Sequence, residues 1–217
     1  MERDDDVAAV WNTIIYGDGT RLAREILTFN LTHDSVRALL VQEPRSEFQR
    51  AFATIVRNRV QRGGILAPGA SMFNKGENGR GIRSRWYPDT LRRRIEAIVY
   101  TRQDIGFVHG DGIEFIRYNG YRLDTAFFID PPYTVAGRRL YKHSELNHRE
   151  LFRVAKSIKG DFLMTYDNAA EIRELAHEFG FQTALVPMKN THHEIMNELV
   201  VGKNLSWLTA AGAFTPR

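Results

Sequence analysis

The chain has 217 residues, a formal net charge of +4 and no cysteine. A chain of this length can hold one good hydrophobic core and a smaller additional module, but hardly two full domains. Without cysteine it can form neither a disulfide framework nor a thiolate metal site. No apolar stretch reaches the roughly 18 residues of a membrane helix, and the acidic start Met-Glu-Arg-Asp-Asp-Asp is unlike a signal peptide. We therefore expect a soluble, cytoplasmic protein without membrane contact.

The first third of the chain is predicted to be helical, because apolar residues recur at helical spacing behind polar residues that cap helices. The expected helices cover residues 4–16, 20–29, 33–40 and 46–60. A glycine-rich stretch follows over 61–87, and a basic amphipathic helix is expected over 89–101.

From residue 102 onward the pattern alternates between strands and helices, which is typical of an α/β fold. We expect strands over 105–109, 125–129, 161–166, 182–188 and 195–202, and helical segments over 113–118, 147–157 and 169–179. The segment between the last two strands is too short for a crossover helix, so these strands should pair antiparallel. The residues after 208 are expected to be weakly ordered.

The positive charge is concentrated in residues 57–94, which carry ten Lys or Arg residues and two acidic residues. The rest of the chain is mildly acidic. This distribution is typical of a polyanion-binding segment on an otherwise ordinary domain. The glycine-rich part of the segment has six glycines and a Trp-Tyr pair. This composition excludes a compact core and favours nucleic-acid contact over a merely flexible surface loop.

A second distinctive stretch is Asp130-Pro131-Pro132-Tyr133, which ends the apolar run 126–129. Each proline fixes φ and lacks an N–H group, so the chain can neither continue a strand nor start a helix at once. At the carboxyl end of a strand in an open α/β sheet, this loop would present a carboxylate, backbone carbonyls and an aromatic ring to a flat substrate. The alternative is that Asp130 caps a turn and Tyr133 covers the strand end.

With this motif, followed by Leu140-Tyr141, His148 and Phe162-Leu-Met-Thr-Tyr166-Asp167, the chain resembles the DNA adenine-N6 methyltransferases of the Dam type over most of its length. Two further stretches are similar to that family. Arg57-Asn58-Arg59 with Gly63-Gly64 resembles its target-recognition region, and Thr191-His-His with Glu198-Leu-Val-Val resembles its closing antiparallel strands.

The resemblance implies an α/β fold: an incomplete, Rossmann-like sheet of the S-adenosylmethionine-dependent methyltransferases with an antiparallel terminal hairpin, plus a helical and basic-loop insertion that recognises DNA. It divides the chain into four parts. These are a remnant of the N-terminal catalytic part (1–16), the target-recognition region (17–101), the catalytic α/β part (102–208) and a tail (209–217).

The catalytic residues implied by the resemblance are Asp130, Pro131, Pro132 and Tyr133. In that family the target adenine is flipped out of the duplex, because its amine cannot be reached within the base stack. The Asp130 carboxylate and the Pro131 carbonyl would accept hydrogen bonds from the amine, and Tyr133 would stack on the base, a contact of about 1–3 kcal/mol. Positioning and electrostatics would supply the catalysis, without a covalent enzyme intermediate.

For the cofactor, S-adenosylmethionine, the resemblance implies binding by Glu2, Asp111 and Asp130. Asp111 would accept from the adenine amine, and Glu2 would bind the ribose hydroxyls. Each acid has a plainer interpretation, since Asp111 could hold a Gly-Asp-Gly turn and Glu2 could be a solvated terminal charge. The adjacent His192 and His193 would point to opposite sides of a strand and have no third ligand at metal spacing, so no metal site is expected.

Double-stranded DNA is the expected partner. The residues expected to bind it are Arg57, Asn58, Arg59, Arg62, Lys75, Arg80, Arg83, Arg85 and Lys142. Arginine on guanine and arginine on phosphate look alike in a sequence, so the target site stays open, as does the presence of a restriction enzyme. The resemblance implies a bacterial or phage-encoded protein associated with the nucleoid.

The chain departs from the family in one respect, because the glycine-rich Phe-x-Gly-x-Gly loop that binds the methionine part of the cofactor is absent. The glycine-rich segment 75–81 does not follow a strand and is no substitute. Two explanations remain: a fragment completed by a missing N-terminal segment or another chain, or a degenerate protein that keeps DNA binding only. The alternatives to DNA methylation are therefore a DNA-binding remnant, or methylation of RNA or another planar amine.

We predict that the 217-residue chain alone binds S-adenosylmethionine weakly or not at all. The reason is that the loop expected to hold the methionine part of the cofactor is missing. Isothermal titration calorimetry checks this prediction, and micromolar affinity for the isolated chain would contradict it.

Overall fold

The structure is a computed structural model that describes residues 1–66, 70–72, 79–132, 146–189 and 195–210. The described residues form two compact units, one up to Asp111 and one from Gly112 onward. We call them the helical unit and the sheet unit. Tyr133, Lys75, Lys142, His192 and His193 lie outside the described residues.

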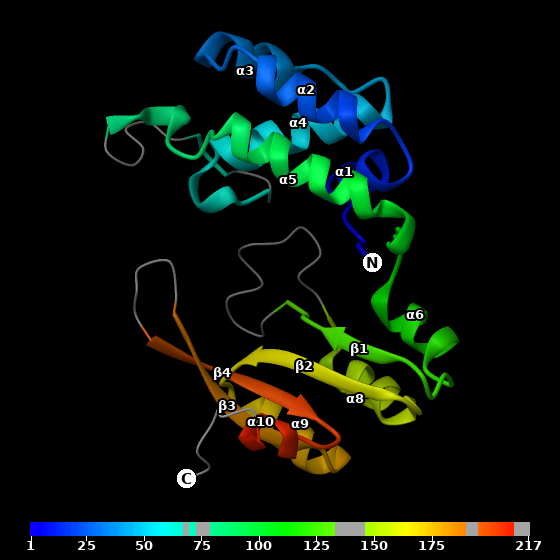
Figure 1. Cartoon of the computed structure of the whole chain (residues 1–217). Coiled ribbons are helices and arrows are strands. Elements are labelled where there is room, and N and C mark those ends of the chain that lie inside the picture. The colour runs from blue at the N-terminus through cyan, green and yellow to red at the C-terminus, as the bar shows by residue number, and fades with distance from the viewer. Residues whose placement is uncertain (67–69, 73–78, 133–145, 190–194, 211–217) are drawn as a thin grey trace. The chain divides into compact units, whose positions relative to one another are not determined.

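The helical unit contains five longer helices, as its sequence pattern predicts (Figure 1). They are α1 (Asp5–Ile15), α2 (Gly19–Thr28), α3 (His33–Val41), α4 (Glu47–Val60) and α5 (Pro88–Thr101). Side chains of Asp4, Asp18, Thr32 and Ser46 accept hydrogen bonds from backbone N–H groups of the first turns of the first four helices. Pro88 begins α5, where a missing N–H group costs nothing.

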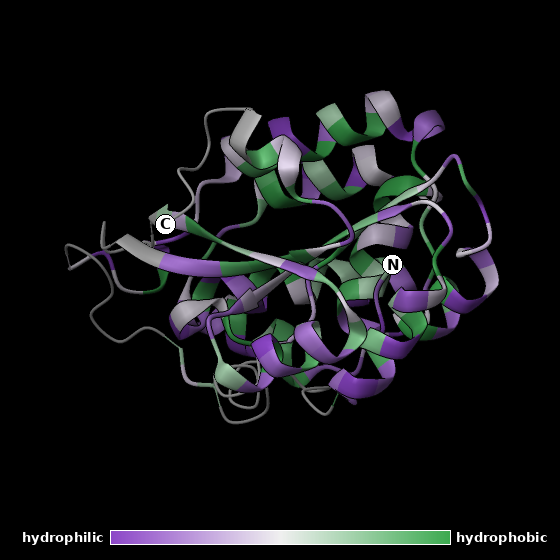
Figure 2. Ribbon diagram, turned by 90° about the horizontal axis from the view of Figure 1, so that it is seen from below, coloured by the Kyte–Doolittle hydropathy of each residue, from purple (hydrophilic) through white to green (hydrophobic). Residues whose placement is uncertain are grey.

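One apolar cluster holds the helical unit together. Its fully buried members include Leu22 and Ile26 of α2 and Val56 and Val60 of α4. In Figure 2, hydrophobic and hydrophilic residues alternate in bands along the helices, as expected for helices with one face toward a core.

The glycine-rich segment between α4 and α5 contributes to this core, which corrects the expectation that it lies wholly outside any compact core. Ile82 and Trp86 belong to the apolar cluster, and Trp86 is only 8% exposed. The Trp86 ring packs edge-on against Phe29, with 6.0 Å between the ring centroids. The described residues of the segment include the 3-10 turns Arg62–Gly64 and Gly81–Arg83.

The prediction of a strand over residues 105–109 is wrong. Residues 102–104 form a 3-10 turn, and only His109 makes a bridge, which is parallel and pairs with Glu2. The reason lies at Phe107, whose backbone N–H donates to the Tyr16 hydroxyl (2.7 Å) and whose carbonyl accepts from it (3.0 Å). A side chain thus satisfies the backbone groups that a neighbouring strand would otherwise satisfy.

The sheet unit begins with helix α6 (Gly112–Asn119) and has four strands in the order β1-β2-β4-β3. Their bounds are Ala126–Ile129, Asp161–Asp167, Gln182–Lys189 and Ile195–Gly202 for β1, β2, β3 and β4. β1 pairs parallel with β2, whereas β4 pairs antiparallel with both β2 and β3. The predicted antiparallel pairing of the last two strands is therefore confirmed. The chain is a mixed α/β protein.

Helices α8 (His148–Ser157) and α9 (Ala170–Phe179) pack on one face of this sheet (Figure 1). Phe127, Phe162, Met164 and Tyr166 point to this face and are buried with residues of the two helices. On the opposite face, the short helix α10 (Ser206–Ala210) buries Leu205 and Leu208 against Val200. The alternation along β2 thus leaves Leu163, Thr165 and Asp167 on the face opposite α8 and α9.

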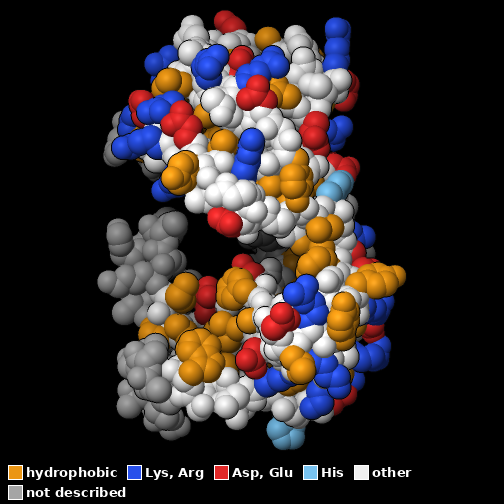
Figure 3. All heavy atoms as spheres, turned by 45° about the vertical axis from the view of Figure 1, so that its right-hand side comes forward, with side chains coloured by type: hydrophobic (Ala, Val, Ile, Leu, Met, Phe, Trp, Pro, Cys, Tyr) orange, Lys and Arg blue, Asp and Glu red, His pale blue; other side chains and the backbone are white. Residues whose placement is uncertain are grey.

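Exposed hydrophobic side chains gather on the sheet unit in Figure 3. In the sheet unit, Tyr118, Tyr121, Leu123 and Phe128 are each more than 70% exposed. None of the helices in the described ranges is both long enough and apolar enough to cross a membrane.

Candidate functional site

The residue at the centre of the candidate site is Asp130, which directly follows β1. Because β1 and β2 are parallel, their carboxyl ends lie at the same edge of the sheet, and Ile129 is paired with Met164. This register places Thr165 beside Asp130, and the Thr165 hydroxyl donates a hydrogen bond of 2.7 Å to Asp130 Oδ1. Asp130 is exposed, so its second carboxylate oxygen is available to a ligand.

Pro131 and Pro132 follow Asp130 and are half-buried. Neither has a backbone N–H group, so the chain leaving β1 offers only acceptors at these positions. Asp130, Pro131 and Pro132 therefore place one carboxylate and two backbone carbonyls beyond the carboxyl end of a parallel strand. This position is where ligands of open α/β sheets bind.

A hydrogen-bonded pair connects β2 to α8 on the other face of the sheet. His148, at the start of α8, lies with its Nδ1 atom 3.1 Å from the hydroxyl of Tyr166. Tyr166 is fully buried, and burial, together with the charges of Asp167 and Glu171, raises its pKa well above the ordinary value for tyrosine. The hydroxyl group of Tyr166 lies on the side of the sheet that carries α8 and α9, opposite to the Thr165 side chain.

Thr165 is the residue of this site that sequence reasoning missed. It lies within the stretch 162–167 that resembles the methyltransferases, but only the register between β1 and β2 shows that it contacts Asp130. The signal that could have found it is the alternation along β2. A polar residue there stands between the buried residues Met164 and Tyr166, and it must therefore face the other side of the sheet.

If Asp130 acts in catalysis, we expect Thr165→Val to lower the catalytic rate about tenfold. The substitution removes the hydrogen bond to the Asp130 carboxylate without a change in side-chain size. Thr165 acts through Asp130, so the loss should appear in kcat with little change in the affinity for DNA. Restoration by Thr165→Ser, which keeps the hydroxyl, is the check. A Thr165→Ser variant as slow as Thr165→Val would contradict this positioning role.

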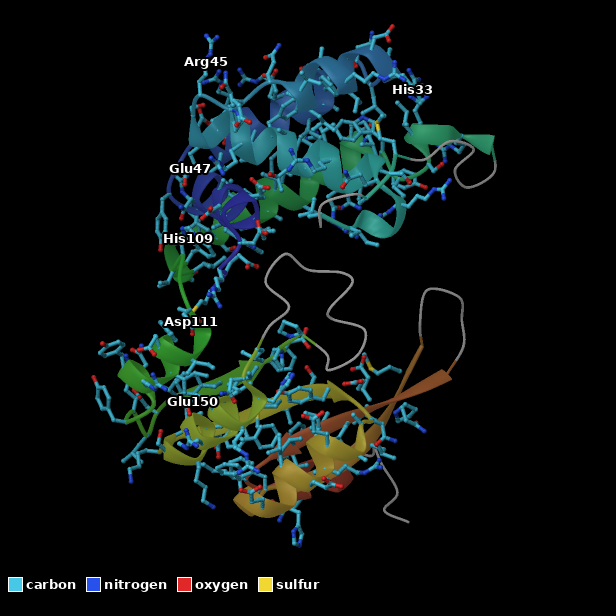
Figure 4. All side chains as sticks on the ribbon, turned by 180° about the vertical axis from the view of Figure 1, so that it is seen from behind. His33, Arg45, Glu47, His109, Asp111 and Glu150 are labelled. Atoms are coloured by element: carbon cyan, nitrogen blue, oxygen red, sulfur yellow. The ribbon has the colours of Figure 1, made fainter. Side chains whose placement is uncertain are left out.

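The two acids expected to bind the cofactor belong to the helical unit. The Glu2 backbone pairs with the segment around His109: its N–H donates to the Val108 carbonyl (3.2 Å), and its carbonyl accepts from the Gly110 N–H (2.8 Å). Asp111 follows directly, just before α6 (Figure 4), and its Oδ2 lies 3.6 Å from Arg3 Nη1. The structure thus brings Glu2 and Asp111 to the ends of two paired segments.

These acids fit the adenosine part of S-adenosylmethionine better than its methionine part. The Asp111 carboxylate is 41% exposed and can accept from an amine. Glu2 Oε1 already accepts from the N–H groups of Arg3 (2.7 Å) and Asp4 (2.8 Å), which fixes the carboxylate at the start of the chain. Among the described residues, the glycines with positive φ are at 63, 64, 79, 81 and 180, so none lies in the segments around Glu2 and Asp111.

The residues expected to bind DNA fall into two groups. Several are engaged within the protein. Arg57 pairs with Asp6 (3.1 Å), Arg83 donates to the Leu31 carbonyl (3.0 Å), and the Arg80 guanidinium lies 5.6 Å from the centre of the Tyr87 ring.

Asn58 holds the glycine pair that follows α4, because its side-chain amide donates to the Gly64 carbonyl (2.7 Å). The guanidinium groups of Arg59 and Arg85 belong to the second group and make no hydrogen bond or ion pair with any described residue. Arg62 is exposed in the turn Arg62–Gly64. The basic residues therefore fall into two groups: arginines that contact other groups of the protein, and arginines whose charge is available to bind a ligand.

No protein-family model matches the chain, and no curated protein matches it with significant sequence similarity. Among the residues that the structure describes, no group of three or more histidine, cysteine or acidic side chains could hold a metal ion.

Proposed function

We propose that this chain is a site-specific DNA adenine-N6 methyltransferase that transfers a methyl group from S-adenosylmethionine to a flipped adenine. The observation that carries the proposal is the hydrogen bond between Thr165 and Asp130 at the carboxyl ends of two parallel strands, directly before two prolines. This arrangement supports the resemblance to the Dam-type family, in which the Asp-Pro-Pro-Tyr loop is the catalytic element. The mixed α/β fold with its antiparallel terminal hairpin is compatible with that family.

Asp130 and Pro131 would act by holding the amine of the flipped adenine. This nitrogen is a poor nucleophile because its lone pair is delocalised into the ring. Two acceptors, the free oxygen of Asp130 and the Pro131 carbonyl, would bind its two hydrogens and favour the sp³ form, in which the lone pair is available. Thr165 fixes the other oxygen of Asp130, so the carboxylate is oriented before the substrate arrives.

S-adenosylmethionine supplies an electrophilic methyl group when it is bound. Asp111 would accept from its adenine amine and Glu2 would bind its ribose hydroxyls. Glu2 forms a bridge with His109, and Asp111 lies two residues beyond His109. Tyr133 would stack on the target base; it lies outside the described residues. The sequence lacks the Phe-x-Gly-x-Gly loop that binds the methionine part in the Dam-type family, so we expect weak binding of the cofactor by this chain alone.

The basic residues of the helical unit would bind the DNA. Arg57 and Arg83 are engaged in contacts within the unit, so their expected role is to shape the surface. Arg59, Arg62 and Arg85 carry charges that duplex DNA would neutralise. So does Arg80, because its contact with the Tyr87 ring leaves its charge without a carboxylate partner among the described residues. Lys75 and Lys142 remain proposals from sequence alone, because they lie outside the described residues.

The experiment that tests the proposal measures transfer of a labelled methyl group from S-adenosylmethionine to duplex DNA. The cofactor is supplied in large excess, because weak binding is expected. Label in N6-methyladenine of the duplex, with little in RNA of the same sequence, would support the proposal. Preferential transfer to RNA would identify an RNA methyltransferase. No transfer to either polymer, together with salt-dependent DNA binding, would identify a DNA-binding protein without catalysis.

A DNA-binding protein without catalysis is the second candidate function. The observation that favours it is the combination of basic, unpaired arginines with the missing loop for the methionine part of the cofactor. The two candidates differ in one respect that can be measured. Methyl transfer to duplex DNA identifies the enzyme, whereas salt-dependent DNA binding without transfer identifies the second candidate.

A further inference from the structure

Three arginines of the helical unit lie next to the same core. Arg59 is in the last turn of α4, Arg85 is in the segment before α5, and Arg94 is in α5. Each directly precedes a buried residue of the apolar cluster; these residues are Val60, Trp86 and Ile95. Because the buried neighbours are fixed by packing, the backbone positions of the three arginines are fixed as well.

Arg85 is the most constrained of the three. Its Nη1 atom is buried and has no hydrogen-bond partner in the described part of the chain. The guanidinium lies against Gly64, since a Cβ atom at position 64 would be 2.7 Å from Nη1 and 3.0 Å from Nη2. Gly64 has a φ of +70°, and Asn58 holds its carbonyl at 2.7 Å. A glycine in left-handed conformation therefore makes room for the guanidinium.

The charges of Arg85 and Arg94 repel the charge of Arg59. Burial, and then the charges of Arg85 and Arg94, lower the pKa of Arg59 below its ordinary value. Other arginines of the same region are neutralised by carboxylates: Arg57 pairs with Asp6 (3.1 Å) and Arg92 with Glu96 (2.6 Å). No carboxylate among the described residues pairs with the three. A buried donor without a partner and a concentration of like charge both favour an anion at this place.

We propose that Arg59, Arg85 and Arg94 form a binding site for a phosphate group of the DNA backbone. A phosphodiester carries one negative charge shared by two oxygens, which guanidinium groups bind in bidentate fashion. Base edges are neutral and would not compensate three positive charges. The site therefore sets the position of the duplex on the helical unit and contributes no sequence preference. This inference rests on the DNA-binding part of the proposed function and does not require methyl transfer.

The test measures the affinity of the full chain for a fluorescent DNA duplex over a range of salt concentrations. Arg85→Gln and, separately, Arg94→Gln are expected to weaken binding about tenfold and to lower the slope of log K against log salt by about 0.9, the value for one lost phosphate contact. Arg92→Gln is the matched control. It removes the same charge from α5, but from a residue already paired with Glu96. Its slope should be that of the unchanged protein.

Thermal unfolding separates this proposal from a structural role of the arginines. If the three arginines form an anion site, Arg85→Gln and Arg94→Gln should be at least as stable as the unchanged chain, because each variant reduces the repulsion between positive charges. Inorganic phosphate should raise the Tm of the unchanged chain more than that of Arg94→Gln. Equal slopes for Arg85→Gln, Arg94→Gln and Arg92→Gln, or variants that lose stability while keeping full DNA affinity, would overturn the site.

The outcomes are independent of catalysis. If the chain binds DNA through these arginines but transfers no methyl group, the phosphate site is supported and the proposed enzymatic activity is contradicted. If the chain transfers methyl groups but the arginine variants have the same slope of log K against log salt as the unchanged protein, the enzymatic activity is supported and the phosphate site is contradicted.

Discussion

Asp130→Ala is expected to abolish methyl transfer to DNA while leaving the affinity for duplex DNA within about twofold. The loss should be at least about 10²–10³-fold, the range seen when one preorganised polar group is removed from an active site. Asp130 is exposed and bonds through its side chain to Thr165, so its removal should cost the fold little. Methyl transfer from labelled S-adenosylmethionine and DNA binding by fluorescence anisotropy are measured on the same preparation.

Two further variants sharpen this result. Asp130→Asn keeps the shape of the side chain but turns one acceptor into a donor, so it should be nearly as inactive as Asp130→Ala. Asp161→Asn is the matched control, since Asp161 is an exposed acid at the opposite end of β2, paired in register with Ala126. Methyl transfer by Asp130→Ala at the rate of Asp161→Asn would remove Asp130 from the mechanism.

Trp86→Ala is expected to destabilise the helical unit by about 3–5 kcal/mol, the usual cost of truncating a large buried aromatic side chain. Trp86 is 8% exposed, and its ring packs against Phe29 within the apolar cluster. Arg85, which directly precedes the tryptophan, depends on this anchor, so DNA binding should fall together with stability. Urea unfolding followed by tryptophan fluorescence and circular dichroism measures the change.

The neighbouring residue provides the control. Tyr87 is 48% exposed, so Tyr87→Ala should change the free energy of unfolding by less than about 0.5 kcal/mol. Its effect should appear in DNA binding instead, because the Arg80 guanidinium lies over its ring. We assign Trp86 to the core and Tyr87 to the surface. Equal losses of stability in Trp86→Ala and Tyr87→Ala would contradict this assignment.

The features that the sequence predicts well are those with local causes. The helices of the first third begin where Asp4, Asp18, Thr32 and Ser46 accept hydrogen bonds from the backbone of the first turn, and a cap needs only the next three residues. The closing hairpin follows from the short distance along the chain between its strands. The position of Asp130 after a strand follows from an apolar run that two prolines end.

The features that the sequence hides depend on contacts between distant residues. Trp86 looks like part of a glycine-rich surface loop, and only its packing on Phe29 makes it a core residue. The segment around Phe107 has the composition of a strand, but the hydroxyl of Tyr16 takes its backbone hydrogen bonds. Thr165 meets Asp130 because of the register of two strands, which composition does not specify.

The position of β4 between β2 and β3 affects how the protein folds during its synthesis on the ribosome. The chain emerges in the order β1, β2, β3 and β4, but β3 has no partner other than β4 among the described strands. The long edge of β2, with Leu163 facing away from α8 and α9, therefore waits until residues 195–202 have left the exit tunnel. Until then a nascent chain exposes an open strand edge, so we expect chaperones to bind this edge until β4 has paired with β2.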